Sequence, residues 1–63
     1  MEQAIKVLIV DDHKLISEAW TSLLKDAPGI SVIGNADNEN DAFDKAVQLR
    51  PDIILMEFIL QPW

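Results

Sequence analysis

The stretch Lys6-Val-Leu-Ile-Val-Asp-Asp-His13 decides the fold, because an apolar strand runs directly into two adjacent carboxylates. Residues 7–10 are apolar on both faces, which is typical of a central strand in a parallel sheet covered on both sides. Open α/β sheets place their binding crevices at the carboxyl ends of their strands. The sequence therefore predicts a binding site at Asp11 and Asp12.

The two neighbouring carboxylates repel each other, by roughly 4 kcal/mol at a separation of about 4 Å and an effective dielectric near 20. Two arrangements offset this repulsion. A hard cation such as Mg²⁺ takes carboxylate ligands. Alternatively, Asp11 and Asp12 cap the following helix and oppose its dipole. The residues alone leave both interpretations open.

Composition narrows the class of protein. The chain has 63 residues, five basic against eleven acidic side chains, and a net charge of −6. This balance argues against unaided binding to a nucleic acid backbone. There is no cysteine for a disulfide or a cysteine-based zinc site, no apolar stretch long enough to span a membrane, and no signal-peptide pattern. We expect a single small cytoplasmic domain without membrane or direct nucleic acid contact.

Strand and helix patterns alternate along the chain. The predicted elements are strand 5–10, helix 14–26, strand 30–36, helix 39–50 and strand 52–58. Pro28-Gly29 and Pro51 end the two helices, and Asn38 is suited to cap the second. A β-α-β-α-β unit with right-handed crossovers is α/β and doubly wound, with parallel strands in the order 2-1-3 and one helix on each face.

Helical spacing predicts which side chains form the core. The apolar stripes comprise Leu15, Ile16, Ala19, Trp20, Leu23 and Leu24 in the first helix, and Ala42, Phe43, Ala46, Val47 and Leu49 in the second. We expect these stripes and Met56 to be buried. Gly34 and the polar Ser31 and Asn35 suit an edge position for strand 30–36.

The third strand is the most apolar, yet no later strand in the sequence is available to pair with its outer edge. An open apolar edge is a template for another chain. We therefore expect a homo-oligomer, either a strand-edge dimer or a domain swap. The residues expected at this interface are Ile53, Leu55, Phe58, Ile59, Leu60 and Trp63.

Three motifs, taken in their order along the chain, resemble those of a known family. They are residues 7–13, residues 36–42 and residues 50–56. The chain resembles the amino-terminal half of a response-regulator receiver domain, the flavodoxin-like phosphoacceptor module of two-component signalling. The Asp-Asp-His form and the Pro51-Asp52 strand entry look most like receivers joined to LuxR-type output domains. The resemblance covers residues 1–63 as a partial receiver, with three strands, two helices and no output domain.

The resemblance implies a role for particular residues. Asp11 and Asp12 match the acidic pair that binds Mg²⁺. Glu57 and the backbone carbonyl of Ile59 match the positions that complete the protein's share of the metal shell. Glu57 stands at the position of the aspartate that accepts a phosphoryl group from a histidine kinase, the partner expected for an intact parent protein. This likeness favours the metal interpretation of the acidic pair over the capping one.

Two departures limit what the resemblance implies. Glu57 is one methylene longer than aspartate, and a misplacement of about 1 Å can cost a hundredfold in rate. The switch hydroxyl and the lysine of the family lie on later strands. We therefore expect weak or absent Mg²⁺ binding, no productive phosphotransfer and no enzymatic activity. The expected function is that of a receiver fragment whose ancestral role is Mg²⁺-dependent phosphoryl acceptance.

Two other functions stay open. One is a self-associating module that uses the third strand. The other is a nucleotide- or flavin-binding half-domain, which needs a glycine-rich loop where Asp11-Asp12-His13 stands. His13 is expected to be solvated. The acidic side chains near the second helix are expected to complement its dipole and aid solubility; they are Asp37, Glu39, Asp41 and Asp44.

Overall fold

The computed structural model describes residues 4–57 and has the five expected elements in the expected order. They are β1 (Ile5–Asp11), α1 (Lys14–Lys25), β2 (Ile30–Ala36), α2 (Glu39–Leu49) and β3 (Ile53–Glu57). The predicted bounds are confirmed to within one residue at every end that the structure describes. Among the described residues, no helix is long and apolar enough to cross a membrane.

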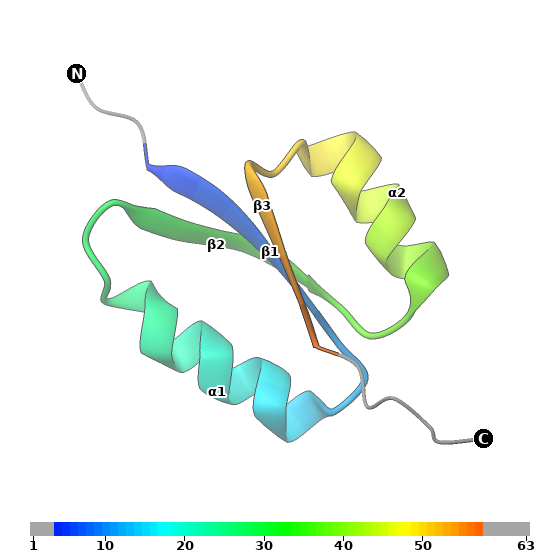
Figure 1. The fold of residues 1–63 in the computed structure, drawn as a ribbon, viewed down its shortest axis with the longest axis horizontal. Coiled ribbons are helices and arrows are strands. Elements are labelled where there is room, and N and C mark those ends of the chain that lie inside the picture. Colours follow the sequence, from blue (N-terminus) through cyan, green and yellow to red (C-terminus); the bar gives the residue numbers. More distant parts are fainter. Residues whose placement is uncertain (1–3, 58–63) are drawn as a thin grey trace.

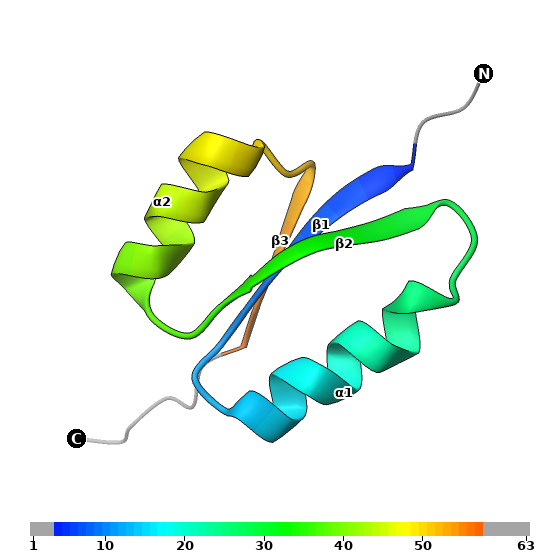
Figure 2. The ribbon, with the colours of Figure 1, turned by 180° about the vertical axis from the view of Figure 1, so that it is seen from behind.

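The three strands form one parallel sheet in the order β2-β1-β3, which confirms the predicted topology. Figures 1 and 2 show this sheet edge-on, with α1 and α2 on opposite faces. Leu8 of the central strand pairs with Gly34 of β2 and with Ile54 of β3. The predicted edge position of β2 is also confirmed, and its register shifts once, between Val7 and Leu8 of β1.

The predicted helix boundaries have the expected local causes. The side chain of Asn38 accepts a hydrogen bond of 2.8 Å from the backbone N–H of Asp41 and so caps α2. Arg50 ends α2 in the left-handed region, at φ 50°, and the next residue is Pro51. Gly29, at φ 81°, occupies a backbone conformation that side-chain-bearing residues rarely adopt.

The core is centred on β1. Val7, Leu8, Ile9 and Val10 are buried, as the continuous apolar run predicts for a strand covered on both faces. On one face, Leu8 and Val10 pack in a cluster with two alanines, Ala36 of β2 and Ala42 of α2. This cluster is small, so the side chains of β1 carry most of the hydrophobic stabilisation.

The predicted burial of the helix stripes is wrong for most of the large side chains. In α1, Leu15 is 80% and Leu23 is 68% exposed, Trp20 is half-buried, and the one buried residue is Ser17. The exposed members of the predicted core are Leu15, Ile16, Ala19 and Leu23 in α1, Phe43, Val47 and Leu49 in α2, and Met56 in β3.

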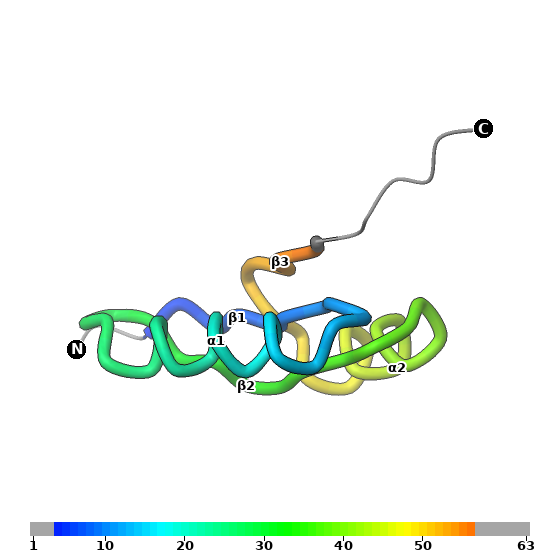
Figure 3. The backbone as a smooth tube through the Cα atoms, turned by 90° about the horizontal axis from the view of Figure 1, so that it is seen from below, coloured from blue at the N-terminus to red at the C-terminus, as the bar shows by residue number. Residues whose placement is uncertain are grey.

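The position of the helices explains this exposure. Both helices contact β1 and β2, and neither contacts β3. Figure 3 shows β3 extending away from the layer that the other four elements form. Apolar periodicity identifies the face of a helix that can be buried, but burial also requires a strand or helix opposite that face.

The third strand is attached to the sheet through β1. The side chain of Asp52 accepts a hydrogen bond of 2.9 Å from the N–H of Lys6, and the N–H of Asp52 donates one of 2.8 Å to the carbonyl of Lys6. Ile53, Ile54 and Met56 are 43–52% exposed. No strand among residues 4–57 pairs with the outer edge of β3, as predicted.

Candidate functional site

The acidic pair lies at the carboxyl end of β1, and its two side chains have different environments. Asp11 is the last residue of the strand and is 2% exposed, whereas the side chain of Asp12 is 55% exposed. One carboxylate oxygen of Asp11, Oδ1, accepts a hydrogen bond of 2.8 Å from the N–H of His13. The other oxygen, Oδ2, is buried without a hydrogen-bond partner. A buried oxygen without a donor is costly, so Oδ2 of Asp11 is suited to bind a cation.

Neither aspartate caps α1. The N-cap residue is His13, no side chain makes a cap hydrogen bond there, and no acidic residue lies in the first turn. The capping interpretation of Asp11 and Asp12 is therefore wrong. The strand continues through Asp11, so the buried carboxylate lies at the end of the sheet and before the helix begins.

His13 contacts both carboxylates, although its side chain was expected to contact only solvent. Its Nδ1 lies 2.9 Å from Oδ1 of Asp12 and 3.5 Å from Oδ1 of Asp11, although the side chain is 44% exposed. One ligand atom from each of the three residues lies within 4.8 Å of the other two. The signal in the sequence was the position of His13 directly after the acidic pair.

The backbone of β3 reaches this end of the sheet beside Asp11. Glu57, at the position that the resemblance implies for the phosphoacceptor, is the register partner of Asp11. Adjacent strands in a sheet are about 4.8 Å apart. Ile59, the predicted carbonyl ligand, lies outside the described residues, as do Phe58, Leu60 and Trp63 of the predicted interface.

A polar pocket lies next to the acidic pair, between the two helices and the carboxyl ends of β1 and β2. Five acidic side chains and three lysines line it, together with smaller polar groups. The lining residues are Asp11, Asp12, Lys14, Ser17, Glu18, Thr21, Ser22, Lys25, Asn35, Ala36, Asp37, Asp41 and Lys45.

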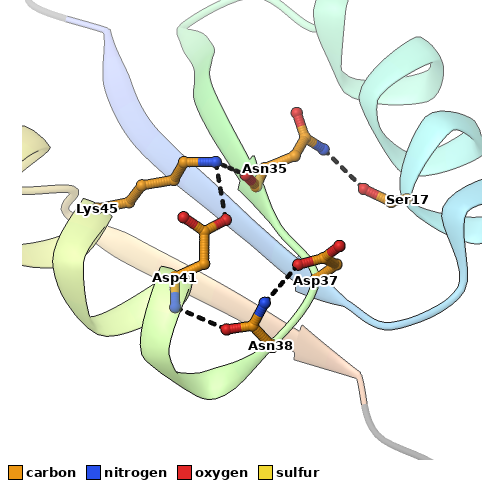
Figure 4. A network of polar contacts seen from close by, with 6 residues as sticks. All are labelled: Ser17, Asn35, Asp37, Asn38, Asp41 and Lys45. Carbon is orange, nitrogen blue, oxygen red and sulfur yellow. Dashed lines mark hydrogen bonds and ion pairs between the residues drawn. The ribbon is translucent and has the colours of Figure 1, made fainter.

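A hydrogen-bond network on one side of this pocket joins both helices to β2 (Figure 4). Nδ2 of Asn35 donates to the hydroxyls of Ser17 at 2.7 Å and Thr21 at 2.9 Å, both on α1. From α2, Nζ of Lys45 donates to the backbone carbonyl of Asn35 and, at 3.0 Å, to Asp41. Asn35 is thus the residue of β2 at which the two helices are linked.

This network changes the interpretation of the acidic side chains near α2. Asp41 forms an ion pair with Lys45, and Asp37 accepts a hydrogen bond of 2.7 Å from the side chain of Asn38. Glu39 and Asp41 lie in the first turn, as dipole complementarity predicts. The network was not predicted from the sequence, in which its one signal is the polar Asn35 within a strand.

Comparisons with known proteins agree with this geometry. The family model described as response regulator receiver domain matches residues 7–62. The chain is 45% identical over 53 residues, 84% of its length, to the response regulator GacA of Pseudomonas syringae pv. syringae. It is 42% identical over 57 residues, 90% of its length, to the response regulator protein VraR of Staphylococcus epidermidis.

A third relative has a different name. The chain is 40% identical over 60 residues, 95% of its length, to protein-glutamate methylesterase/protein-glutamine glutaminase 2 of Methanosarcina mazei. The match covers 16% of that relative, 25% of GacA and 27% of VraR, so the chain spans about a quarter or less of the proteins it matches. With a parallel sheet in the order 2-1-3 and an acidic pair at the end of its central strand, the chain belongs to the response regulator receiver domain family.

Proposed function

We propose that this chain is a receiver segment that holds a divalent cation at Asp11 and Asp12 and does not accept a phosphoryl group. The register pairing of Asp11 with Glu57 is the observation that carries the proposal, because it brings the acceptor position beside a buried carboxylate. The signalling role rests on the receiver family match and on relatives named as response regulators.

The residues present fit Mg²⁺. Asp11 keeps one buried oxygen without a donor, and Asp12 adds an exposed carboxylate next to it. Mg²⁺ prefers oxygen ligands and keeps several waters, so two protein carboxylates beside a polar pocket suit it. When bound, the ion would neutralise charge that gathers on a phosphoryl group. The carbonyl of Ile59 remains a proposed third protein ligand.

The identity of residue 57 is the reason to propose that phosphoryl transfer fails. Glutamate has one more methylene than aspartate, so a nucleophilic oxygen extends about 1 Å further from the same backbone position. Phosphoryl transfer depends on in-line positioning, and the protein contributes little else than positioning and charge stabilisation. The segment would then keep the cation site of a receiver without its acceptor chemistry, and it would have no enzymatic activity of its own.

For the whole protein, we propose the partners and location that the family implies. The parent would be cytoplasmic, a histidine kinase would be its phosphoryl donor, and the parent would couple its receiver to transcription. The names of GacA and VraR as response regulators support the first part of this proposal. The net charge of −6 argues against direct DNA contact by this segment.

Labelling with a small acyl-phosphate donor in the presence of Mg²⁺ tests the proposal. We expect no acid-stable, base-labile phosphoryl label on the 63-residue chain. We expect none on the Glu57→Asp variant of this chain either, because the lysine and the hydroxyl of other receivers come from later strands. A longer version of Glu57→Asp that supplies those strands is expected to label. Labelling of the wild-type 63-residue chain would contradict the proposal.

A second candidate function is self-association through β3. The observation that favours it is the exposure of Ile53, Ile54 and Met56 on a strand whose outer edge is unpaired within residues 4–57. Backbone pairing between two such strands would satisfy the edge and bury both apolar faces. Light scattering over a concentration series tests it. A defined dimer supports the proposal, and a monomer at high concentration contradicts it.

A further inference from the structure

The cluster of Asp11, Asp12 and His13 contains a nitrogen ligand as well as carboxylate oxygens. We infer that His13 is a third ligand of the cation site and that the site therefore selects a divalent transition-metal ion, such as Co²⁺, over Mg²⁺. This inference rests on the proposed cation site and adds its metal preference.

The distances between the ligand atoms suit a shared ion. Two ligand atoms at right angles, each about 2.1 Å from an ion, lie about 3.0 Å apart, and the spacing increases to about 3.4 Å for tetrahedral angles. Nδ1 of His13 is 2.9 Å from Oδ1 of Asp12 and 3.5 Å from Oδ1 of Asp11. These two spacings are close to those of ligands that share one ion, and the ligand atoms of all three residues lie within 4.8 Å of one another.

A second observation also points to a ligand here. Asp11 is 2% exposed, lines the polar pocket and has one oxygen without any hydrogen-bond partner. A cation that Asp11 binds through both carboxylate oxygens would satisfy Oδ2 and offset the neighbouring charge of Asp12. The remaining ligands would be water, for which the pocket and the 55% exposed Asp12 provide access.

The chemistry of the donor set determines the preference. Imidazole nitrogen is a good ligand for Co²⁺, Ni²⁺ and Zn²⁺, whereas Mg²⁺ takes oxygen ligands almost exclusively. A transition-metal ion at the acidic pair would therefore take Nδ1 of His13 as a ligand, while Mg²⁺ bound by the carboxylates alone would not need His13.

The experiment compares Co²⁺ and Mg²⁺ binding to the untagged 63-residue chain. His13 is the only histidine and there is no cysteine, so imidazole ligation has only one source. We expect Co²⁺ to shift the ring protons of His13 strongly and to bind at least about tenfold tighter than Mg²⁺. His13→Ala is expected to weaken Co²⁺ at least about tenfold and to change Mg²⁺ affinity by less than about twofold.

Two further variants control for charge. Asp12→Asn is expected to weaken both ions. Asp44→Asn removes the same charge from α2, outside the lining of the pocket, and is expected to change neither affinity.

If Mg²⁺ binds and His13→Ala leaves Co²⁺ affinity unchanged, the inference is wrong and the proposed cation site stands. If Co²⁺ binds through His13 but Mg²⁺ does not bind, the inference stands and the magnesium proposal is wrong. If neither ion binds, both are wrong.

Discussion

The sheet has two edge strands, β2 and β3, and side chains of the helices secure only the first. Asn35 of β2 bonds to Ser17 and Thr21 from α1, and its carbonyl accepts from Lys45 of α2. By contrast, β3 contacts neither helix, and its apolar side chains are half exposed. An edge strand crossed by polar side chains resists pairing with another chain, whereas a bare apolar edge invites it.

Association is therefore expected at β3 and not at β2. If β2 could pair as easily as β3, copies of the chain would join head to tail, and such contacts need not close. If only β3 pairs, two copies associate through the same strand about a two-fold axis, and no edge is left for a third copy. The contrast between the strands therefore predicts a closed dimer.

The largest effect is expected from a core side chain of the central strand. Leu8 is fully buried in β1 and packs in the cluster with Val10, Ala36 and Ala42. Leu8→Ala is expected to cost about 2–5 kcal/mol of unfolding free energy, as much as a domain of this size can hold. Urea unfolding followed by circular dichroism measures it. Leu15→Ala, at a position that is 80% exposed, is the control and is expected to change little.

A smaller effect is expected from a charge on the bare edge strand. Ile53 begins β3 and is 49% exposed, so Ile53→Lys is expected to weaken self-association at least about tenfold without unfolding the chain. Light scattering provides the dissociation constant. The matched control is Ser31→Lys on the exposed part of β2, which is expected to leave association unchanged. Equal loss in both variants would show that β2 also takes part.

The smallest effect is expected where a side chain secures β2. Lys45→Ala removes the bonds to Asp41 and to the carbonyl of Asn35. Because the side chain of Lys45 is 35% exposed, we expect a loss of only about 1 kcal/mol in unfolding free energy. Lys25→Ala, at the exposed end of α1, controls for loss of charge. If Lys45→Ala also raises the association constant, the role of Lys45 in protecting the edge of β2 is supported. Equal unfolding free energies of Lys45→Ala and Lys25→Ala would contradict a stabilising role for the bonds of Lys45.

Sequence patterns predicted the elements of this fold because each pattern has a local cause. The apolar run before Asp11 predicted the central strand. Asn38 predicted the start of α2, and Gly29 predicted the end of α1. These are effects of a few neighbouring residues on backbone conformation and burial. They are independent of what lies on the far side of each helix.

The sequence did not predict which apolar side chains are buried. Leu15 and Phe43 have the periodicity of core residues, but within residues 4–57 no strand or helix covers them. The candidate site was predicted through Asp11, Asp12 and Glu57, and His13 contacts its own neighbours in the sequence. The contacts of Asn35 with Ser17 and Lys45 instead depend on distances across the fold. Such contacts follow from how the helices lie on the sheet, which periodicity does not specify.

A Mg²⁺ titration followed by backbone amide resonances tests whether Asp11 and Asp12 form a cation site beside Glu57. Saturable shifts are expected, largest at Asp11, Asp12 and Glu57, because Glu57 is the register partner of Asp11. Asp11→Asn should abolish them. Shifts spread evenly over exposed acidic residues such as Asp44, or no saturation, would contradict a cation site at the end of β1.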